Sequence, residues 1–323
     1  MELNEFLAEW HNDNPRILVH TSGSTGKPKP LMVEKRRMLN SARITCDFLG
    51  LKPGDTALLC MPLDYIAGKM MVVRSLQRDL RLTSVRPSSH PLADETLPSF
   101  TFAAMVPMQV YNSLKVPCER ERLIRIRHLI IGGGAISDEL AQMIKPLPNA
   151  VWSTYGMTET LSHIALRRLN GPDASLWYTP FDGVGISLNA DGCLVIDAPE
   201  VCAEPLVTND IAQLRTDDRT GKTLFRIKGR KDNVVCSGGI KIQIEEVEET
   251  LRPHLQAPFM IIKRQDEMLG EKAVLLTESA DLTHIEEICR NTLPKYWVPR
   301  EFLHIDRLPL TETGKPKRSG IEV

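Results

Sequence analysis

The sequence contains little that would suggest disulfides, a metal cluster or a membrane segment. Its seven cysteines are scattered and odd in number, and none forms a Cys-x-x-Cys pair. This pattern disfavours both a disulfide framework and a zinc site. No apolar run approaches the ~18 residues of a transmembrane helix, and the N-terminus lacks the basic and apolar regions of a secretory signal. We therefore expect a cytoplasmic protein without an integral membrane segment.

A marked excess of charge of one sign is also lacking. Lysine and arginine together number 40 against 41 acidic residues, for a net charge of −1. This balance disfavours a nucleic-acid binder that works by neutralising phosphates. The most basic run, residues 120–128, alternates with apolar residues. We interpret it as a solvated helix face that leads into a strand, with a binding patch as the less favoured alternative.

The chain does have the length and the patterning of a two-domain α/β protein. Its 323 residues exceed a typical single domain. Apolar strands alternate with helix-like segments up to residue 153, which predicts a mostly parallel sheet covered by helices. Turns at 189–192 and 219–222 predict an antiparallel β region over 181–227. We interpret the polar stretch 228–241 as a linker, and expect a large domain over 1–229 and a small α+β domain over 230–323.

One stretch, HTSGSTGKPKP at residues 20–30, is typical of a phosphate-binding loop. Glycines let backbone N–H groups approach an anion, hydroxyls donate further hydrogen bonds and lysines supply positive charge. It is not a Walker loop, because Gly23 and Gly26 are too close together and Lys27 is followed by Pro28. Taken alone, a surface turn rich in glycine and serine explains it equally well.

Three other stretches place polar groups at expected strand ends or turns. The run GGGA at 132–135 lacks the third glycine of a dinucleotide fingerprint, so it favours either a base lying against backbone or tight packing. The run STYGMTET at 153–160 offers Tyr155 for stacking and Glu159 for a metal, or is a turn that starts a helix. Asp210 is either a ribose ligand or an ordinary turn residue.

Four motifs then occur in a definite order: TSGSTGKPK at 21–29, YGMTE at 155–159, GRKD at 229–232 followed by Ser-Gly-Gly, and PLTETGK at 309–315. Together they closely resemble the motifs of the adenylate-forming superfamily of acyl-CoA synthetases, adenylation domains and luciferases. The resemblance runs over nearly the whole chain. Within the superfamily, the run STYGMTETLSHIAL is most similar to the o-succinylbenzoate–CoA ligases of menaquinone synthesis.

The resemblance implies an enzyme that uses ATP, Mg²⁺ and CoA to activate a carboxylic acid. The carboxylate would attack the α-phosphate to give an acyl-adenylate and pyrophosphate, and the CoA thiol would then expel AMP. A metal ion and a positioned ammonium group would neutralise the charge that develops in the first step. The resemblance also implies that the small C-terminal domain is mobile.

The resemblance further assigns a role to each motif residue. The ATP phosphates would be bound by Thr21, Ser22, Gly23, Ser24, Thr25, Gly26, Lys27 and Lys29. Adenine and ribose would lie against Gly132, Gly133, Gly134, Ala135, Tyr155, Gly156, Asp210 and Arg230. The catalytic residues would be Thr158, Glu159 and Lys315, with Glu159 also the magnesium ligand. Asp232 would be the hinge, and Ser237, Gly238 and Gly239 would line the CoA passage. The acid pocket is predicted at Tyr65, Ser162 and His163, for which core packing is an equally good explanation.

The chain departs from the family pattern in several places. Asn209 stands where the family usually has glycine, and Tyr65 replaces a frequent histidine. After the predicted hinge, relatives commonly have Gly-Gly-Glu-Asn, whereas this chain has Gly239-Ile240-Lys241. Only residues 1–20 precede the phosphate loop, so we expect part of the usual first subdomain to be absent. The alternatives are a ligase for another aryl or fatty acid, a relative that acylates a carrier protein, and a non-catalytic nucleotide-binding relative. The expected partners are the acid, ATP and CoA, and a homodimer is left open.

Overall fold

The computed structural model describes residues 1–20, 30–134, 136–310, 317, 318 and 321. The chain forms two compact units. The larger unit comprises Met1–Ile186, Ile196–Leu206 and Arg215–Phe225, and the smaller unit comprises Ser187–Val195, Val207–Leu214 and Arg226–Val323. The division passes through a β-sheet, so each unit is made of three separate segments of the chain.

A seven-stranded sheet forms the centre of the larger unit, in the order β4-β3-β5-β6-β7-β8-β9. The pairs that join β4, β3, β5, β6 and β7 are all parallel, whereas β8 and β9 are added antiparallel. The mostly parallel sheet predicted from the alternating pattern is therefore confirmed. The strands are β3 (Thr56–Leu59), β4 (Arg81–Ser84), β5 (Phe102–Met105), β6 (His128–Ile131), β7 (Ala150–Gly156), β8 (His163–Arg168) and β9 (Thr179–Pro180).

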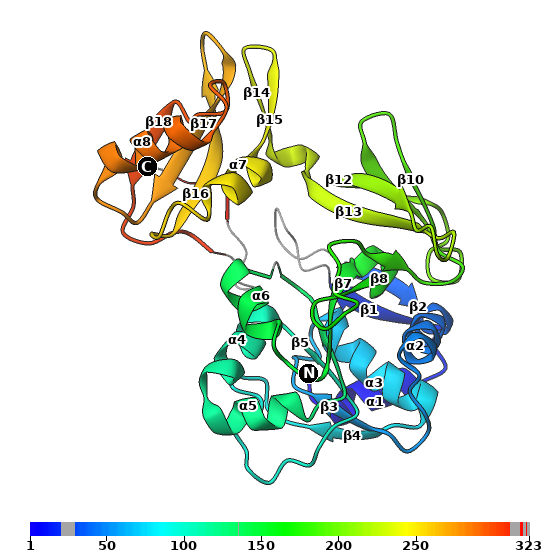
Figure 1. Ribbon diagram of the computed structural model, residues 1–323. Helices are drawn as coiled ribbons and strands as arrows, with labels where there is room; N and C mark the ends of the chain where they lie inside the picture. The colour runs from blue at the N-terminus through cyan, green and yellow to red at the C-terminus, as the bar shows by residue number, and fades with distance from the viewer. Residues whose placement is uncertain (21–29, 135, 311–316, 319–320, 322–323) are drawn as a thin grey trace. The chain divides into compact units, whose positions relative to one another are not determined.

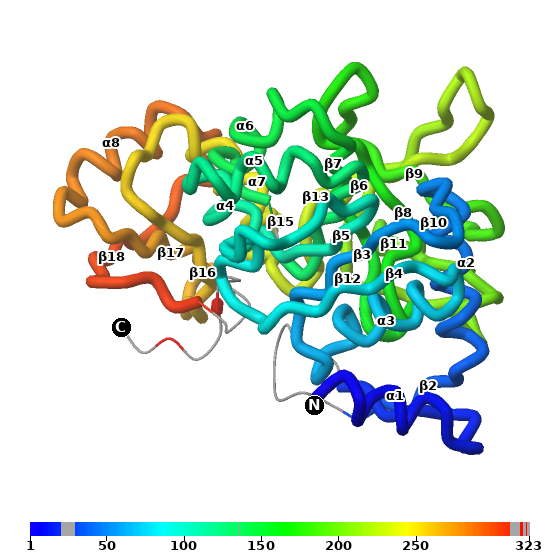
Figure 2. Tube along the Cα trace, turned by 90° about the horizontal axis from the view of Figure 1, so that it is seen from below, coloured from blue at the N-terminus to red at the C-terminus, as the bar shows by residue number. Residues whose placement is uncertain are grey.

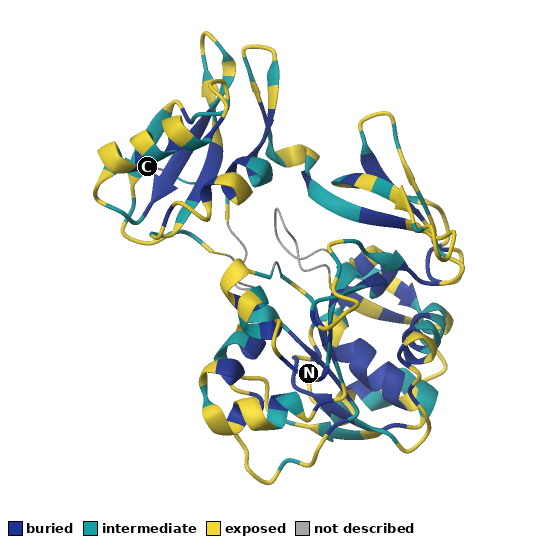
Figure 3. Ribbon diagram, viewed as in Figure 1, coloured by how far each residue is buried: buried dark blue, intermediate teal, exposed yellow. Residues whose placement is uncertain are grey.

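Helices cover both faces of this sheet, as Figures 1 and 2 show from two directions. On one face lie α2 (Lys35–Leu49) and α3 (Ile66–Arg78), and on the other α4 (Pro107–Lys115), α5 (Pro117–Ile124) and α6 (Asp138–Ile144). Their ends follow the local sequence: Gly50 ends α2 at φ 64°, and the Ser137 hydroxyl accepts a hydrogen bond from the Leu140 N–H at the start of α6. The strands between the helices are largely buried (Figure 3).

The N-terminal segment forms α1 (Leu3–His11) and a separate two-stranded antiparallel sheet of β1 (Arg16–His20) and β2 (Pro30–Glu34). Strand β1 is only half buried, because Ile17 and Val19 face the core while Leu18 is 38% exposed. Helix α2 begins at Lys35, directly after β2. The phosphate loop 21–29 lies outside the described residues.

A four-stranded sheet follows, with its strands in sequence order: β10 (Gly185–Leu188), β11 (Cys193–Asp197), β12 (Leu206–Thr216) and β13 (Thr223–Arg230). The turn between β10 and β11 is closed by the Asn189 N–H, which donates to the Cys193 carbonyl at 3.0 Å. In the turn between β12 and β13, the Asp217 N–H donates to the Lys222 carbonyl at 2.9 Å. Both turns predicted from the sequence are present.

The stretch 228–241 is not a linker, so that interpretation was wrong. Its first residues complete β13, and the remainder forms a short 3₁₀ helix (Lys231–Asn233) and an antiparallel hairpin of β14 (Val234–Ser237) and β15 (Ile240–Gln243). Val235 is fully buried in the core of the smaller unit. Gly238 and Gly239 make the turn at φ 57° and 83°, a conformation that costs glycine little. High charge and paired glycines thus concealed a strand–turn–strand pattern.

The rest of the smaller unit is an α+β fold. A five-stranded sheet runs β15-β14-β17-β16, with β18 also paired to β17. Its further elements are α7 (Ile244–Leu251), β16 (Phe259–Asp266), β17 (Gly270–Thr277), α8 (Leu282–Thr292) and β18 (Glu301–His304). Two buried clusters, one on each side of the hairpin β16–β17, form its core.

The described part of the chain contains no helix with both the length and the apolar composition to cross a bilayer. All seven cysteines carry free thiols, and five of them are buried. The exposed ones are Cys118, in the larger unit, and Cys236, in the smaller unit.

The hairpin at Gly238 and Gly239 gives a first prediction. Gly239→Ala places a Cβ at φ 83°, which should lower the free energy of unfolding of the smaller unit by about 1 kcal/mol. Lys241→Ala, an exposed change in the same hairpin, should alter it by less than about 0.5 kcal/mol. Urea titration monitored by tryptophan fluorescence measures both; equal effects would mean that the turn is not formed in solution.

Candidate active site

Polar and glycine residues gather at the carboxyl ends of the parallel strands of the larger unit. Gly132 follows β6, Tyr155 and Gly156 end β7, and Tyr65 precedes α3 after β3. Because the strands are parallel, their carboxyl ends share one edge of the sheet, the edge at which ligands of such sheets bind. The residues predicted for the adenine site and the acid pocket therefore follow strands that end at one edge.

A close backbone approach shapes the turn after β7. A Cβ on Gly156 would lie 2.2 Å from the Ser162 carbonyl oxygen and 2.4 Å from the His163 Cα, so only glycine fits. The pairing of β7 with β8 is irregular at this point. Leu161 adopts φ 63° in the same turn, which is a strained conformation for a residue with a side chain. The strain is held in place by the Thr160 hydroxyl, which donates to the Ser162 carbonyl at 2.7 Å.

This turn presents the predicted catalytic pair of the larger unit. Thr158 and Glu159 lie in a one-turn 3₁₀ helix, Thr158–Thr160, with Thr158 buried and Glu159 exposed. A single exposed carboxylate suits Mg²⁺, which is commonly held by one or two carboxylates together with substrate phosphates. The described residues contain no group of three or more candidate metal ligands. Glu159 therefore fits a magnesium ion that is shared with a nucleotide.

Tyr155 and the glycines before α6 also have structural partners. The Tyr155 ring packs against Phe225 with ring centroids 4.9 Å apart and against Tyr178 at 5.7 Å. A Cβ on Gly132 would lie 2.4 Å from the Thr154 hydroxyl oxygen. The aromatic cluster fixes one face of the predicted adenine site, and packing alone is enough to require glycine at 132.

The predicted acid-pocket residues Ser162 and His163 belong to a buried hydrogen-bond chain. The Arg74 Nη2 donates to the Ser162 hydroxyl at 2.5 Å, and that hydroxyl lies 3.2 Å from the His163 Nδ1. On the other side of the ring, His163 Nε2 lies 3.2 Å from the Thr45 hydroxyl, which donates to the Ser41 carbonyl. Because the Thr45 hydroxyl gives its proton to the Ser41 carbonyl, it accepts from the His163 Nε2–H, and Nδ1 of the neutral ring accepts from the Ser162 hydroxyl.

His163 is held neutral by its surroundings. It is buried, and desolvation together with the nearby charge of Arg74 lowers its pKa well below the ordinary value of 6.5. The hydrogen-bond assignment agrees with this, because a neutral ring donates from Nε2 to Thr45 and accepts at Nδ1 from Ser162. His163 is therefore a fixed neutral group within this buried hydrogen-bond chain.

Arg74, which the sequence reasoning did not single out, is a buried cation beside the predicted acid-pocket residue Ser162. It lies on α3 and is 2% exposed, and its Nε has no hydrogen-bond partner in the described part of the chain. No ion pair to a carboxylate is found for it among the same residues, and burial lowers its pKa to about 10. It is still a cation at neutral pH. The available signal was an arginine inside the apolar run MMVVRSL.

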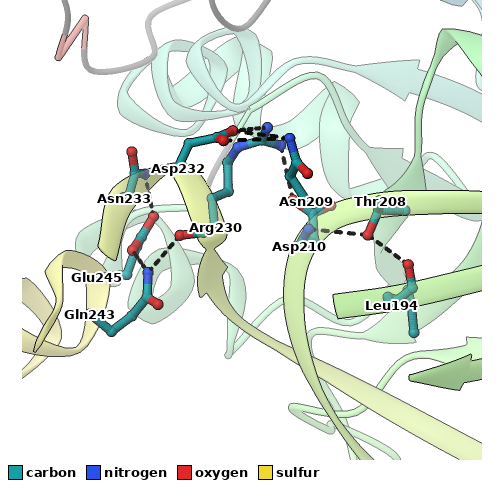
Figure 4. A network of polar contacts seen from close by, with 9 residues as sticks. All are labelled: Leu194, Thr208, Asn209, Asp210, Arg230, Asp232, Asn233, Gln243 and Glu245. Carbon is teal, nitrogen blue, oxygen red and sulfur yellow. Dashed lines mark hydrogen bonds and ion pairs between the residues drawn. The ribbon is translucent and has the colours of Figure 1, made fainter. Parts of the chain in front are cut away.

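A second polar cluster forms within the smaller unit, around the predicted ribose residues (Figure 4). Arg230 donates from Nη1 to Asp210 at 3.0 Å and from Nη2 to Asp232 at 2.8 Å. Burial acts to lower the pKa of Arg230, but the two carboxylates raise it overall. The structure thus brings together Asp210, Arg230 and the predicted hinge residue Asp232.

The predicted hinge residue, Asp232, has one further contact. It is made to Asn209, one of the residues that depart from the family pattern. The Asn209 side-chain amide donates to the two carboxylate oxygens of Asp232 at 3.3 and 3.4 Å. The Thr208 hydroxyl supports this strand by accepting from the Asp210 N–H and donating to the Leu194 carbonyl. Asn209 thus links β12 to Asp232, the predicted hinge residue.

Several predicted site residues are not placed by the structure. The phosphate-loop residues 21–29, Ala135 and Lys315 lie outside the described residues. The predicted CoA-passage residues Ser237, Gly238 and Gly239 form the end of β14 and the turn after it in the smaller unit. The hairpin itself accounts for the two glycines, and their proposed role in thiol access remains a prediction.

Comparison with known proteins gives consistent matches. The family model described as AMP-binding enzyme matches residues 4–203. A 2-succinylbenzoate–CoA ligase from Bacillus mycoides (strain KBAB4) is 25% identical over 95% of this chain and 69% of its own length. The Salmonella typhimurium protein of the same name is 27% identical over 98% of this chain and 69% of its own length. The matches therefore extend well beyond the region covered by the family model.

Solved structures match with the same overall fold. An acyl-CoA synthetase (AMP-forming)/AMP-acid ligase II-like protein from Dyadobacter fermentans is 33% identical, with a TM-score of 0.67 over 97% of this chain and 91% of that one. The o-succinylbenzoate coenzyme A synthetase of Bacillus subtilis, solved with ATP and magnesium ion, has a TM-score of 0.74 and 23% identity over 94% of this chain and 69% of its own. The match therefore covers most of the first protein and about two thirds of the second.

The buried histidine predicts a pH dependence of stability. Since the folded-state pKa of His163 lies below its unfolded value near 6.5, the unfolded chain binds the proton more readily. The stability contributed by neutral His163 is therefore present above about pH 6.5 and falls by about 1.4 kcal/mol per pH unit below it. Unfolding titrations between pH 7.5 and 5.5 should show a shallower slope for His163→Gln. The exposed His11→Gln should keep the original slope.

Proposed function

This chain belongs to the AMP-binding enzyme family and is an adenylate-forming acid–CoA ligase, and we propose that its acid is o-succinylbenzoate. This acid carries an aromatic ring and two carboxylates, of which only one is activated. The second carboxylate needs a counter-charge if it is to leave water. The proposal therefore depends on a cation in the acid pocket.

The observation that carries the proposal is the buried guanidinium of Arg74. Isolated burial of a charge is costly, and this cation has no carboxylate partner among the described residues. A substrate carboxylate would supply the missing charge, and its oxygens match the fork geometry of a guanidinium. Ser162 and His163, the two residues predicted to border the acid, belong to the same hydrogen-bond chain.

The same observation weighs against the alternatives. A fatty acid has one carboxylate, which must sit at the reacting phosphate, so its tail would leave Arg74 uncompensated. A non-catalytic relative would have no use for an acid pocket with its own cation. The names of the similar Bacillus and Salmonella ligases support the proposal from a separate direction.

In the proposed reaction, a carboxylate oxygen of the acid attacks the α-phosphorus of ATP and pyrophosphate leaves. Mg²⁺, held by Glu159 and the phosphates, would supply positive charge to the displaced oxygens. Asp210 would accept hydrogen bonds from the ribose hydroxyls, while Arg230 holds its carboxylate in place. The CoA sulfur would then attack the acyl carbon, with AMP as the leaving group. The resemblance alone assigns to Lys315 the role of the mobile ammonium group in the first step.

A variant at Arg74 tests the choice of acid. Arg74→Met should lower kcat/KM for o-succinylbenzoate about 100-fold, because a hydrogen-bonded pair with a charged group contributes about 1.5–3 kcal/mol. Acids that lack the second carboxylate should change little. Arg78→Met, on the same helix and paired with Asp47 at the surface, is the matched control. Acid-dependent pyrophosphate release over a panel of aryl, fatty and dicarboxylic acids measures the effect, and Arg74→Lys provides a milder change if folding is impaired.

Two results with the same panel of acids would contradict the proposal. An inert o-succinylbenzoate beside a rapidly used fatty or aryl monoacid would exclude the assigned substrate. An equal loss for acids with one and with two carboxylates in Arg74→Met would show that Arg74 acts on folding instead of on the substrate.

A separate variant tests the adenylation step. Lys315→Ala should abolish adenylation while largely sparing ATP binding and thioester formation from supplied acyl-adenylate, because the ammonium is needed only where charge develops on the α-phosphate. Pyrophosphate release, nucleotide titration and thioester formation measure the three properties. If adenylation survives, the role assigned to Lys315 is wrong.

A further inference from the structure

Two side chains of the smaller unit, Gln243 and Glu245, form a polar brace beside the predicted ribose residues. Gln243 ends β15 and is 9% exposed, and its amide Nε2 donates to the Arg230 carbonyl at 3.0 Å. The same nitrogen donates to Glu245, in the first turn of α7. An amide nitrogen carries two protons, one for each of these acceptors, so the contacts assign the orientation of the Gln243 amide.

The brace holds the backbone on both sides of Arg230 (Figure 4). After Arg230, the Asn233 Nδ2 donates to the Glu245 Oε1 at 2.5 Å. Before it, a Cβ on Gly229 would lie 2.6 Å from the Glu245 Oε2 and 2.8 Å from the Gln243 Cδ. The brace therefore packs directly on the Gly229 backbone, where no side chain fits. All of these residues belong to the smaller unit.

The backbone that the brace holds carries the guanidinium of Arg230, which donates to Asp210 at 3.0 Å. A long arginine side chain reaches a fixed point only if its own backbone is fixed. A carboxylate offers about four lone-pair sites, so Asp210 can accept from ribose hydroxyls while it also accepts from Arg230. Hydrogen bonds weaken as their distance and direction depart from the ideal. A shift of the Arg230 backbone would therefore weaken the contact between Asp210 and a ribose.

We propose that Gln243, supported by Glu245, is a positioning residue for ribose recognition. The inference rests on the proposed function, in which Asp210 accepts hydrogen bonds from the ribose hydroxyls of ATP. Gln243 acts through Arg230 and makes no hydrogen bond to the nucleotide itself. Its loss should therefore reduce the preference for nucleotides that carry ribose hydroxyls, and leave the binding of nucleotides without them unchanged.

The test compares ATP with 2′,3′-dideoxyATP, which lacks both hydroxyls. Gln243→Met keeps a side chain of similar length and removes the donor. It should weaken ATP binding roughly 3- to 10-fold and 2′,3′-dideoxyATP binding less than about twofold, as measured by equilibrium titration of the intact chain. In acid-dependent pyrophosphate release, KM for ATP should rise while kcat stays within about twofold. Gln265→Ala, at an exposed glutamine of the same unit, is the control and should leave both affinities unchanged.

A second variant covers the case in which Gln243→Met does not fold. Glu245→Gln keeps the size of the side chain but removes the charge that holds the Gln243 amide. It should reduce the preference for ATP over 2′,3′-dideoxyATP in the same direction and by a smaller factor. A folded Glu245→Gln enzyme with an unchanged preference would count against the brace.

A double-mutant cycle shows whether Gln243 acts through the ribose contact. Asp210→Asn should remove the preference for ATP, and adding Gln243→Met to it should reduce the preference no further. Equal weakening of both nucleotides by Gln243→Met, or unchanged affinities in a folded enzyme, would overturn the inference alone. If Asp210→Asn keeps the full preference, the ribose role assigned to Asp210 is wrong and the inference falls with it. The choice of acid fails separately, in the acid panel.

Discussion

The candidate site in the larger unit depends on one close approach of backbone to backbone. The backbone of Gly156 lies against that of Ser162 and His163. No side chain fits between them, so the chain turns back within six residues of the end of β7. That turn exposes Glu159, buries Thr158 and directs His163 and Ser162 toward α2 and α3. The predicted metal ligand and two of the three predicted acid-pocket residues therefore come from one short segment. A larger residue at 156 would disturb both at once.

Two arginines show how the same side chain serves different purposes. Arg230 bridges two carboxylates, so its charge is balanced within the protein and its role is to hold Asp210 and Asp232 in register. Arg74 is more deeply buried and has no such partner among the described residues. A balanced cation organises its neighbours, whereas an unbalanced one favours an anionic ligand. The contrast is the physical basis for assigning the second carboxylate of the substrate to Arg74.

The sequence predicted the larger sheet well because its strands are short apolar runs separated by clear turn and cap residues. The start of α6 at Ser137 and the turn at Asn189 follow from local chemistry that tertiary packing does not override. The stretch 228–241 was misread because its exposed charges outnumber the few residues, such as Val235, that face the core. A hairpin with one buried face needs only alternate apolar positions, and paired glycines are as typical of its turn as of a linker.

The candidate site was predictable to the extent that its motifs are continuous in sequence. Asp210 and Arg230, which the resemblance assigns to the ribose together, are in contact, although their functional roles stay predictions. Arg74 was not found, because its importance arises from burial and from a contact to Ser162, 88 residues away. The ion pair of Arg318 with Glu248 is hidden from the sequence in the same way, because the two residues are 70 positions apart. Charge compensation across such separations is invisible to pattern reading.

The distribution of thiols has a practical consequence for spectroscopy. Cys118 and Cys236 are the exposed cysteines, and each of the two units carries one of them. A maleimide dye or a nitroxide would react with these two positions in preference to the buried thiols. The unmodified sequence thus offers a donor–acceptor or spin-label pair across the units, and energy transfer or dipolar coupling would report their separation in solution with and without nucleotide.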